Sequence, residues 1–175
     1  MAMEAVEFRR LVETHQRMVF SLALRLTGEY GAAEEVAQDA FLDLFRKGER
    51  LESEDHVRFW LRRVTVHRAT DALRRRSRQP EAAAEEWMEE RHGSANGDDT
   101  DAPMNAGVAA KLEDLLQVLP EPMRVAVVLR YQEEMRPEEI AALLGQTVTT
   151  VKSNLRRGLA LLRRKAAVTM KEYVR

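Results

Sequence analysis

The stretch Pro137 to Arg164, PEEIAALLGQTVTTVKSNLRRGLALLRR, predicts two helices joined by a tight turn. Pro137 suits the first position of a helix, where its missing N–H group costs nothing, and Gly145 suits a left-handed C-terminal cap. One of three threonines can cap the second helix: Thr147, Thr149 or Thr150. This order is typical of a DNA-reading helix-turn-helix, and an ordinary helical hairpin with a solvated face is the alternative.

The second helix of this pair has an apolar face and a basic face. Its apolar residues recur at spacings of four, four and three: Val151, Leu155, Leu159 and Leu162. The segment from Lys152 to Lys165 holds six basic residues and no acidic one. Because the apolar side chains must face a scaffold, the residues one and two places after Val151 and Leu155 point away from it. They are Lys152, Ser153, Arg156 and Arg157, which makes them candidates for contact with DNA.

The composition excludes several classes of protein. The chain has 175 residues, of which 33% are charged and 6% aromatic, and this balance favours a helical protein over a β-sandwich. It has no cysteine, which excludes disulfides, thiolate catalysis and cysteine zinc sites. Its four histidines are far apart in the sequence. We find no phosphate-binding glycine loop, no nucleophile beside a base and no metal-ligand spacing, so we expect neither an enzyme nor a cofactor or metal.

Charge is distributed unevenly although the net charge is only −1. Residues 1–79 carry a net charge of +2, residues 80–110 carry −7, and residues 111–175 carry +4. The acidic middle ends in a Gly-, Asn-, Asp- and Pro-rich run that cannot bury a core, and we expect a flexible acidic linker there. The basic segments on either side of this linker indicate that the protein binds nucleic acid.

Helical patterns occupy both ends of the chain. Before the linker, apolar spacing predicts helices over residues 5–27, 31–47 and 55–78, with a polar loop at 48–56. After it, we expect helices at 108–119 and 122–131, then the helix-turn-helix, then a short tail after Lys165. The fold class is therefore all-α, with two small helical domains at 1–79 and 108–175 and a linker at 80–107.

The third of these helices is rich in arginine. Between Arg58 and Arg78 there are eight arginines and a single acid, Asp71. Such a helix attracts phosphates, because each contact releases condensed counterions, although a solubilising cluster is the alternative. On the helix over 31–47, an acidic face opposite the apolar one is either a solvated face or a docking surface for a basic partner.

Four stretches together resemble a known family. EEIAALLG with TVKSNLRRGLALLRR resembles the promoter-reading domain of bacterial extracytoplasmic-function (ECF) RNA polymerase sigma factors, and LPEPMRVAVVLRYQEEM resembles the helix before it. RLTGEYGAAEEVAQDAFLDLFRK resembles the segment that grips the polymerase clamp. FWLRRVTVHRATDALRRRSR resembles the helix that recognises and melts the downstream element. The likeness covers about Leu11 to Arg164 without the linker, so it implies a sigma region 2-like bundle and a region 4-like helix-turn-helix.

The resemblance assigns roles to three sets of residues. Core-polymerase binding falls to Glu35, Gln38, Asp39 and Leu42. Binding and melting of the downstream element fall to Arg58, Trp60, Arg63, His67, Asp71, Arg74 and Arg75. Recognition of the upstream element falls to Thr149, Lys152, Ser153, Arg156 and Arg157. His67 is a departure, because many family members have asparagine there. In the family the N-terminal domain also holds unstacked bases, for which loop 48–56 and the third helix would supply planar groups and arginines.

The function implied is that of an alternative sigma factor, a binding protein and not an enzyme. Its expected partners are core RNA polymerase, promoter DNA and an anti-sigma factor. No apolar run approaches the roughly 20 residues of a membrane span, and no signal-peptide core is present, so we expect no membrane insertion and a cytoplasmic location. Two alternatives remain: a helix-turn-helix regulator that acts without polymerase, and a sigma mimic that sequesters an anti-sigma factor.

Overall fold

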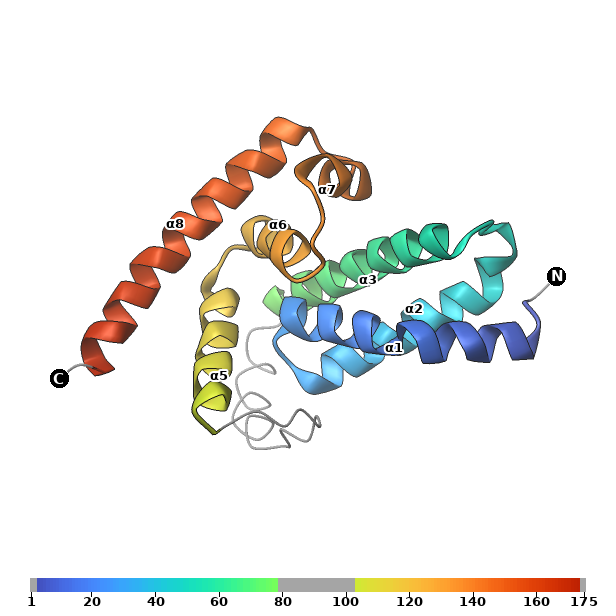
Figure 1. Cartoon of the computed structure of the whole chain (residues 1–175), viewed down its shortest axis with the longest axis horizontal. Helices are drawn as coiled ribbons and strands as arrows, with labels where there is room; N and C mark the ends of the chain where they lie inside the picture. Colours follow the sequence, from blue (N-terminus) through green and yellow to red (C-terminus); the bar gives the residue numbers. More distant parts are fainter. Residues whose placement is uncertain (1–2, 79–102, 174–175) are drawn as a thin grey trace.

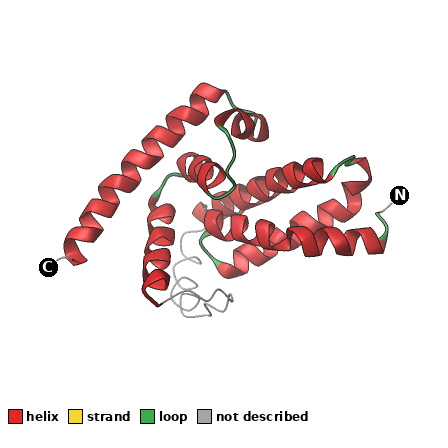
Figure 2. Cartoon of the chain, viewed as in Figure 1, coloured by secondary structure: helices red, strands yellow, loops and turns green. Residues whose placement is uncertain are grey.

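The computed structural model describes residues 3–78 and 103–173, and within these ranges all regular structure is helical (Figures 1 and 2). The elements are α1 (Ala5–Thr27), α2 (Tyr30–Lys47), a 3-10 turn η1 (Gly48–Arg50), α3 (Glu54–Ser77), α5 (Pro103–Val118), α6 (Glu121–Tyr131), α7 (Pro137–Leu144) and α8 (Val148–Tyr173). The all-α prediction is therefore confirmed. None of the helices in these two ranges is long and apolar enough to cross a membrane.

Helices α1, α2 and α3 pack side by side and form an N-terminal unit (Figure 1). Local signals set their ends. Gly28 ends α1 with φ of 73°, and its backbone N–H donates to the Leu24 carbonyl at 2.7 Å, as a left-handed cap does. Ser53 starts α3, because its hydroxyl accepts a hydrogen bond from the His56 backbone N–H at 3.2 Å. The outer end of this unit has its own apolar core of Leu11, Val19, Ala40, Leu44, Val57 and Leu61.

The C-terminal unit holds the helix-turn-helix, and its turn confirms the local predictions. Gly145 adopts φ of 65° after α7, and Thr147 caps α8 by accepting a hydrogen bond from the Thr150 backbone N–H at 3.2 Å. At the start of α7 the carboxylate of Glu139 accepts a hydrogen bond from the Arg136 backbone N–H at 2.7 Å. The hydrogen bonds from Arg136, first from its backbone, lower the pKa of Glu139.

Two predicted boundaries in this unit were wrong. Helix α5 begins at Pro103 and not at residue 108, so its first turn takes up the end of the predicted linker at 80–107. Proline is well suited to the first turn of a helix, which explains the earlier start. Helix α8 runs on to Tyr173 instead of ending near Lys165, because no glycine or proline follows to stop it. The rest of the predicted linker, residues 80–102, lies outside the described residues.

The two units share one hydrophobic core, which the sequence did not predict. Leu22, Leu26 and Val36 of the N-terminal unit belong to the same buried cluster as Leu129, Ile140 and Val151 of the C-terminal unit. Helix α1 contacts α5 and α6, and α3 contacts α7. The chain is thus folded with its two helical units packed against each other.

Arg124 of α6 fastens the two units at the end of α1. Its guanidinium donates to the Leu26 carbonyl at 2.8 Å and, on its own side, to the Gln117 and Leu119 carbonyls at 2.9 and 3.0 Å. It also donates to the Gln117 side-chain oxygen at 2.9 Å, and Gln117 donates in turn to the Arg25 carbonyl at 3.0 Å. Burial lowers the pKa of Arg124, but the carbonyls at the C-terminal ends of α1 and α5 favour a cation there.

His15 gives the N-terminal unit a predicted sensitivity to acid. The imidazole is buried on α1, its Nε2 atom has no hydrogen-bond partner, and its pKa is lowered first by burial and then by Arg58. Arg10 and Arg62 act in the same direction, and Glu54 opposes them. Since the folded state binds the proton less tightly than the unfolded state, the stabilising effect of neutral His15 is complete above about pH 6.5 and is lost as pH falls below it.

We therefore expect the free energy of unfolding to fall between about pH 6.5 and pH 5, and His15→Leu to remove most of that fall. Urea unfolding followed by circular dichroism at a series of pH values measures it. His67→Leu is the matched control, since His67 is exposed on α3 and its loss should leave the slope in place. The same pH slope in the wild type and in His15→Leu would contradict the prediction.

Candidate nucleic-acid and protein-binding surfaces

The first half of α8 exposes the basic residues that the sequence placed against DNA. Lys152, Arg156 and Arg157 are exposed, and so is Thr149. Ser153 is half-buried on the same side of the helix. Beyond them, Arg163 and Arg164 are exposed further along the helix. Every predicted residue of this set therefore lies on a side of α8 from which it can reach a ligand.

The opposite side of α8 packs against α6 and α7 and fixes the orientation of this basic face. Val151 and Leu155 are buried as predicted, whereas Leu159 and Leu162 are only half-buried. Gly158 is the third buried residue of the contact, and sequence reasoning missed it. A Cβ atom at Gly158 would lie 3.0 Å from a methyl group of Val127, so glycine lets α8 approach α6 closely.

The predicted residues of α3 divide into two groups. Five follow spacings of three, four, four and three and so share one face: Trp60, Arg63, His67, Asp71 and Arg74. Of these Trp60 is half-buried, and the other four are exposed. Arg58 and Arg75 are exposed too; Arg75, four places after Asp71, lies at the edge of this face, whereas Arg58 lies off it. Helix α3 thus presents a stripe that carries arginine, histidine and an edge of tryptophan.

Arg62 of α3 was not among the predicted residues, and helical geometry places it off the stripe, toward the packed side of the helix. Its Nε atom donates to the Glu133 carboxylate at 2.8 Å, in the loop between α6 and α7. The Glu133 side chain is only 5% exposed and that of Arg62 is 20% exposed. No feature of the sequence near Arg62 indicated a partner 71 positions away.

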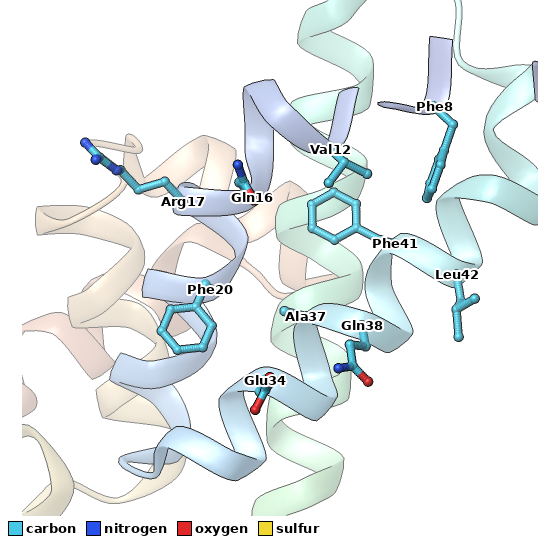
Figure 3. A pocket seen from close by; sticks show the side chains of 10 residues that line it. All are labelled: Phe8, Val12, Gln16, Arg17, Phe20, Glu34, Ala37, Gln38, Phe41 and Leu42. Carbon is cyan, nitrogen blue, oxygen red and sulfur yellow. The ribbon is translucent and has the colours of Figure 1, made fainter. Parts of the chain in front are cut away.

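A groove between α1 and α2 has a volume of about 770 Å³ and a mainly apolar lining (Figure 3). Phe8, Val12 and Phe20 line it from α1, and Phe41 and Leu42 line it from α2. Its polar residues are Gln16, Arg17, Glu34 and Gln38. The Leu42 side chain is half exposed, at 50%, so the groove offers an unpaired apolar surface. Such a surface, rimmed by polar groups, is suited to an apolar face of another protein.

The four residues predicted to bind polymerase share one face of α2 by their helical spacing, but they border different hollows. Gln38 and Leu42 line the groove, and Glu34, which was not in the predicted set, joins them. Asp39 turns toward α3, where its carboxylate lies 3.7 Å from Arg68. Arg68 is held mainly by Asp43, at 2.6 Å, and this hydrogen bond raises the pKa of Arg68. Glu35 lines a separate hollow with Arg75 and Arg76 of α3.

The loop at 48–56 borders a hollow of different character from the one expected. It lies between the loop and the start of α1, with a volume of about 560 Å³. Its charged lining residues are Glu4, Glu7, Arg10, Glu52 and Glu54, and no aromatic residue is among those that line it. Carboxylates repel phosphates, so this hollow is not suited to a nucleic-acid backbone, whereas Arg50 and His56 of the loop itself are exposed. The residues 3–78 and 103–173 also contain no set of three acidic or histidine side chains placed to bind one metal ion.

Comparison with known families finds two matches in the same order as the two helical units. Residues 11–79 match the Sigma-70 region 2 family, and residues 109–162 match the Sigma-70, region 4 family. The first covers α1 to α3 with the groove and the α3 stripe. The second covers most of α5, all of α6 and α7, and the basic first half of α8.

Relatives along the whole chain carry corresponding names. The chain is 34% identical over 160 residues to the RNA polymerase sigma-E factor of Streptomyces coelicolor, which covers 91% of this chain and 86% of that protein. It is also 34% identical over 154 residues to the ECF RNA polymerase sigma factor SigE of Mycolicibacterium smegmatis, covering 87% of this chain and 59% of that protein.

Two solved structures have a similar fold. One is the sigma factor RpoE in complex with the anti-sigma factor NepR from Bartonella quintana, with a TM-score of 0.70, 20% identity, and coverage of 93% of this chain and 98% of that one. The other is CnrH in complex with the cytosolic domain of CnrY, with a TM-score of 0.64, 21% identity, and coverage of 94% and 90%. At this identity the likeness supports the arrangement of helices.

Proposed function

This chain belongs to the sigma-70 family of RNA polymerase sigma factors, in its extracytoplasmic-function (ECF) group, and we propose that its two helical units divide the work of initiation between three surfaces. As an alternative sigma factor it binds core RNA polymerase and directs it to promoters. The observation that supports the division is that the α1–α2 groove, the α3 stripe and the α8 basic face are separate surfaces on one compact chain. Which residues serve each step is the proposal.

The α1–α2 groove is the proposed contact with core polymerase. Interfaces between proteins gain most of their free energy from a few central apolar or aromatic residues that lose contact with water. Phe41 and Leu42 offer such residues, and Gln38 and Glu34 supply polar groups beside them. Asp39 is less available, because it lies near Arg68, and we assign it a secondary role.

The basic face of α8 is the proposed reader of the upstream promoter element. Entry of such a helix into the major groove places its N-terminal residues at base edges and its later residues near phosphates. Lys152 and Arg157 combine base and phosphate contacts in this arrangement, with Thr149, Ser153 and Arg156 beside them. Arg163 and Arg164 lie further along the helix, where phosphate contact is the geometric expectation.

The α3 stripe is the proposed surface for the separated nontemplate strand. Single strands bind to arginines along their backbone and stack their bases on planar side chains. Trp60, His67 and the arginines of the stripe supply both kinds of group. His67 has a planar ring with a donor and an acceptor, so it can serve where asparagine serves in many family members, but with a different base preference.

In this role the chain supplies binding and strand separation, and the polymerase forms the phosphodiester bonds, so we propose that the chain itself is not an enzyme. Because the chain would act on promoters of chromosomal DNA, we propose a cytoplasmic location. Because similar folds occur in complexes of sigma with anti-sigma factors, an anti-sigma factor is the third proposed partner, beside core polymerase and promoter DNA.

Transcription in vitro tests the function directly. Purified core polymerase is given a library of promoters with and without this protein, and the transcripts are sequenced. We expect a defined set of start sites that appears only with the protein. A transcript profile that the protein leaves unchanged would reject the proposed function, even if the protein binds duplex DNA by itself.

Arg157 and Arg164 provide a matched test of base reading. If Arg157 forms two hydrogen bonds to a base, Arg157→Ala removes about 1–3 kcal/mol of discrimination between the selected upstream element and a scrambled one. Arg164→Ala should weaken binding to both DNAs alike and lower the salt slope by roughly one unit if Arg164 contacts phosphate. Fluorescence anisotropy with both DNAs at two salt concentrations measures this. An equal loss on both DNAs for Arg157→Ala would place base reading on another residue.

A further inference from the structure

Gly158 lies in the middle of α8, where the backbone does not require a glycine. The described glycines with a positive φ are Gly28 and Gly145, each at the end of a helix, whereas Gly158 lies within the regular turns of α8. Glycine weakens the interior of a helix relative to alanine, because it loses more conformational freedom on folding. The backbone conformation of α8 therefore does not explain why a glycine is present at this position.

The space between α8 and α6 does explain it. A Cβ atom at Gly158 would lie 3.0 Å from the Cγ2 methyl group of Val127 and 3.4 Å from the Cβ atom of Met123. Carbon atoms pack best at about 3.5–4.0 Å, so the first of these contacts is too short. Val127 is buried, and its β-branched side chain has few alternative rotamers. A side chain at position 158 would therefore push α8 away from α6.

A displacement at Gly158 would reach the basic face of α8. Arg156 and Arg157 directly precede Gly158 and are exposed, while Lys152 lies six residues earlier, or about 9 Å along the helix axis. Hydrogen bonds from a guanidinium to a base edge need N···O distances of about 2.7–3.2 Å and a coplanar approach. Attraction to a phosphate falls off gradually with distance. A small tilt of α8 would therefore weaken base reading more than it weakens phosphate contact.

We propose that Gly158 is a positioning residue for promoter reading, which seats α8 on α6 at the depth and tilt that bring Arg157 and its neighbours to the base edges. The inference rests on the proposed role of α8 as the reader of the upstream element. Gly158 itself is buried and acts only through the orientation of α8. It consequently affects selectivity between promoters more than total affinity for DNA.

Two templates that compete for the same polymerase measure this selectivity. One template carries the upstream element enriched in the transcription library, and the other is identical except that this element is scrambled. Core polymerase with the full-length chain transcribes both in one reaction, and the ratio of the two transcripts is recorded. Because an unfolded chain initiates on neither template, a loss of folded protein lowers both transcripts and leaves their ratio unchanged.

Gly158→Ala is expected to lower this ratio about three- to tenfold, which is within the discrimination that one base-reading arginine supplies. Gly158→Val should lower it further, because it adds two more methyl groups to the same contact. Val127→Ala removes the methyl group that the new Cβ atom would meet. The double variant Val127→Ala with Gly158→Ala should therefore return the ratio to within about twofold of the wild type, as residues in direct contact compensate for each other.

Two single variants separate positioning from stability. Ile140 of α7 is fully buried, so Ile140→Val loosens the core of the same unit without adding bulk between α8 and α6. Ile140→Val and Val127→Ala should both lower stability to urea and keep the wild-type ratio of transcripts. A ratio in Ile140→Val as low as that in Gly158→Ala would mean that selectivity follows stability, and it would overturn the positioning role.

The remaining outcomes distinguish this inference from the proposed function. A wild-type ratio in Gly158→Ala, or a ratio in the double variant as low as in Gly158→Ala, would overturn the inference while the function stands. If the wild-type chain itself transcribes both templates equally, α8 does not read the upstream element. That result would reject this part of the proposed function and the role of Gly158 with it.

Discussion

Replacing Gln38 and Leu42 together with arginine is expected to weaken binding to core RNA polymerase by at least about 2 kcal/mol, or roughly thirtyfold. Both residues line the α1–α2 groove, and Leu42 exposes half of its side chain there (Figure 3). An arginine at position 42 would bring a charge into a surface that must lose its water on docking. The loss of the leucine contact and the cost of a buried charge act in the same direction.

The double variant should leave the rest of the chain intact. Neither side chain belongs to the buried core, so circular dichroism and binding of the isolated upstream element should match the wild type. Glu13→Arg is the matched control, since Glu13 is exposed on α1 and does not line the groove. Affinity for core polymerase is measured with a fluorescent label on each variant. Wild-type affinity in the double variant would return these residues to the role of an ordinary solvated face.

A third variant compares the two predicted residues that line the groove, Gln38 and Leu42, with the two that do not, Glu35 and Asp39. Glu35 and Asp39 do not line the groove, and they have Arg75 and Arg68 near them, so Glu35→Arg tests a predicted polymerase-binding residue that borders the groove. If the groove carries the binding, Glu35→Arg should lose much less affinity than the double variant. An equal loss would extend the interface around α2 toward α3.

The helix-turn-helix could be predicted from the sequence because its signals are local. Pro137, Gly145 and Thr147 act within one or two turns of their own position, through a missing N–H group, a left-handed φ and a hydroxyl cap. The exposed basic face of α8 follows from the spacing of Val151 and Leu155 for the same reason. The fold class and the family were accessible from these patterns.

The contacts between the two units could not be predicted in this way. Arg124 bonds to the carbonyl of Leu26, which is 98 positions earlier in the chain, and the acceptor is a backbone atom that every residue possesses. Asp39 and Glu34 show the same limit on a smaller scale. Helical spacing identified the polar side of α2 but did not determine which carboxylate faces the groove and which faces Arg68. Which carboxylate faces which partner depends on packing between helices that are distant in the sequence, and helical spacing alone does not specify that packing.

Arg124→Met is expected to lower the free energy of unfolding by about 3–5 kcal/mol, as breaking a buried charged contact does. Methionine keeps much of the length of the side chain but has no donor, so the carbonyls of Leu26, Gln117 and Leu119 lose their partner. Each buried acceptor left without a hydrogen bond costs about 1–3 kcal/mol, less whatever entering water restores. Arg124→Lys should fall between the wild type and Arg124→Met, because an ammonium group has three donors but not the planar fork.

Arg130→Met is the control that separates the contact of Arg124 with the end of α1 from a general role of arginine on α6. Arg130 is half-buried on the same helix, but its hydrogen bond to the Met135 carbonyl, at 3.3 Å, stays within the C-terminal unit. Its loss should cost about 1 kcal/mol or less. Urea unfolding measures the free energy of unfolding of both variants, and hydrogen exchange shows which amides become exposed. Arg124→Met should expose amides at the end of α1, across the contact between the units, whereas Arg130→Met should leave them protected. Similar costs, with unchanged exchange in α1, would mean that apolar packing alone holds the two units together.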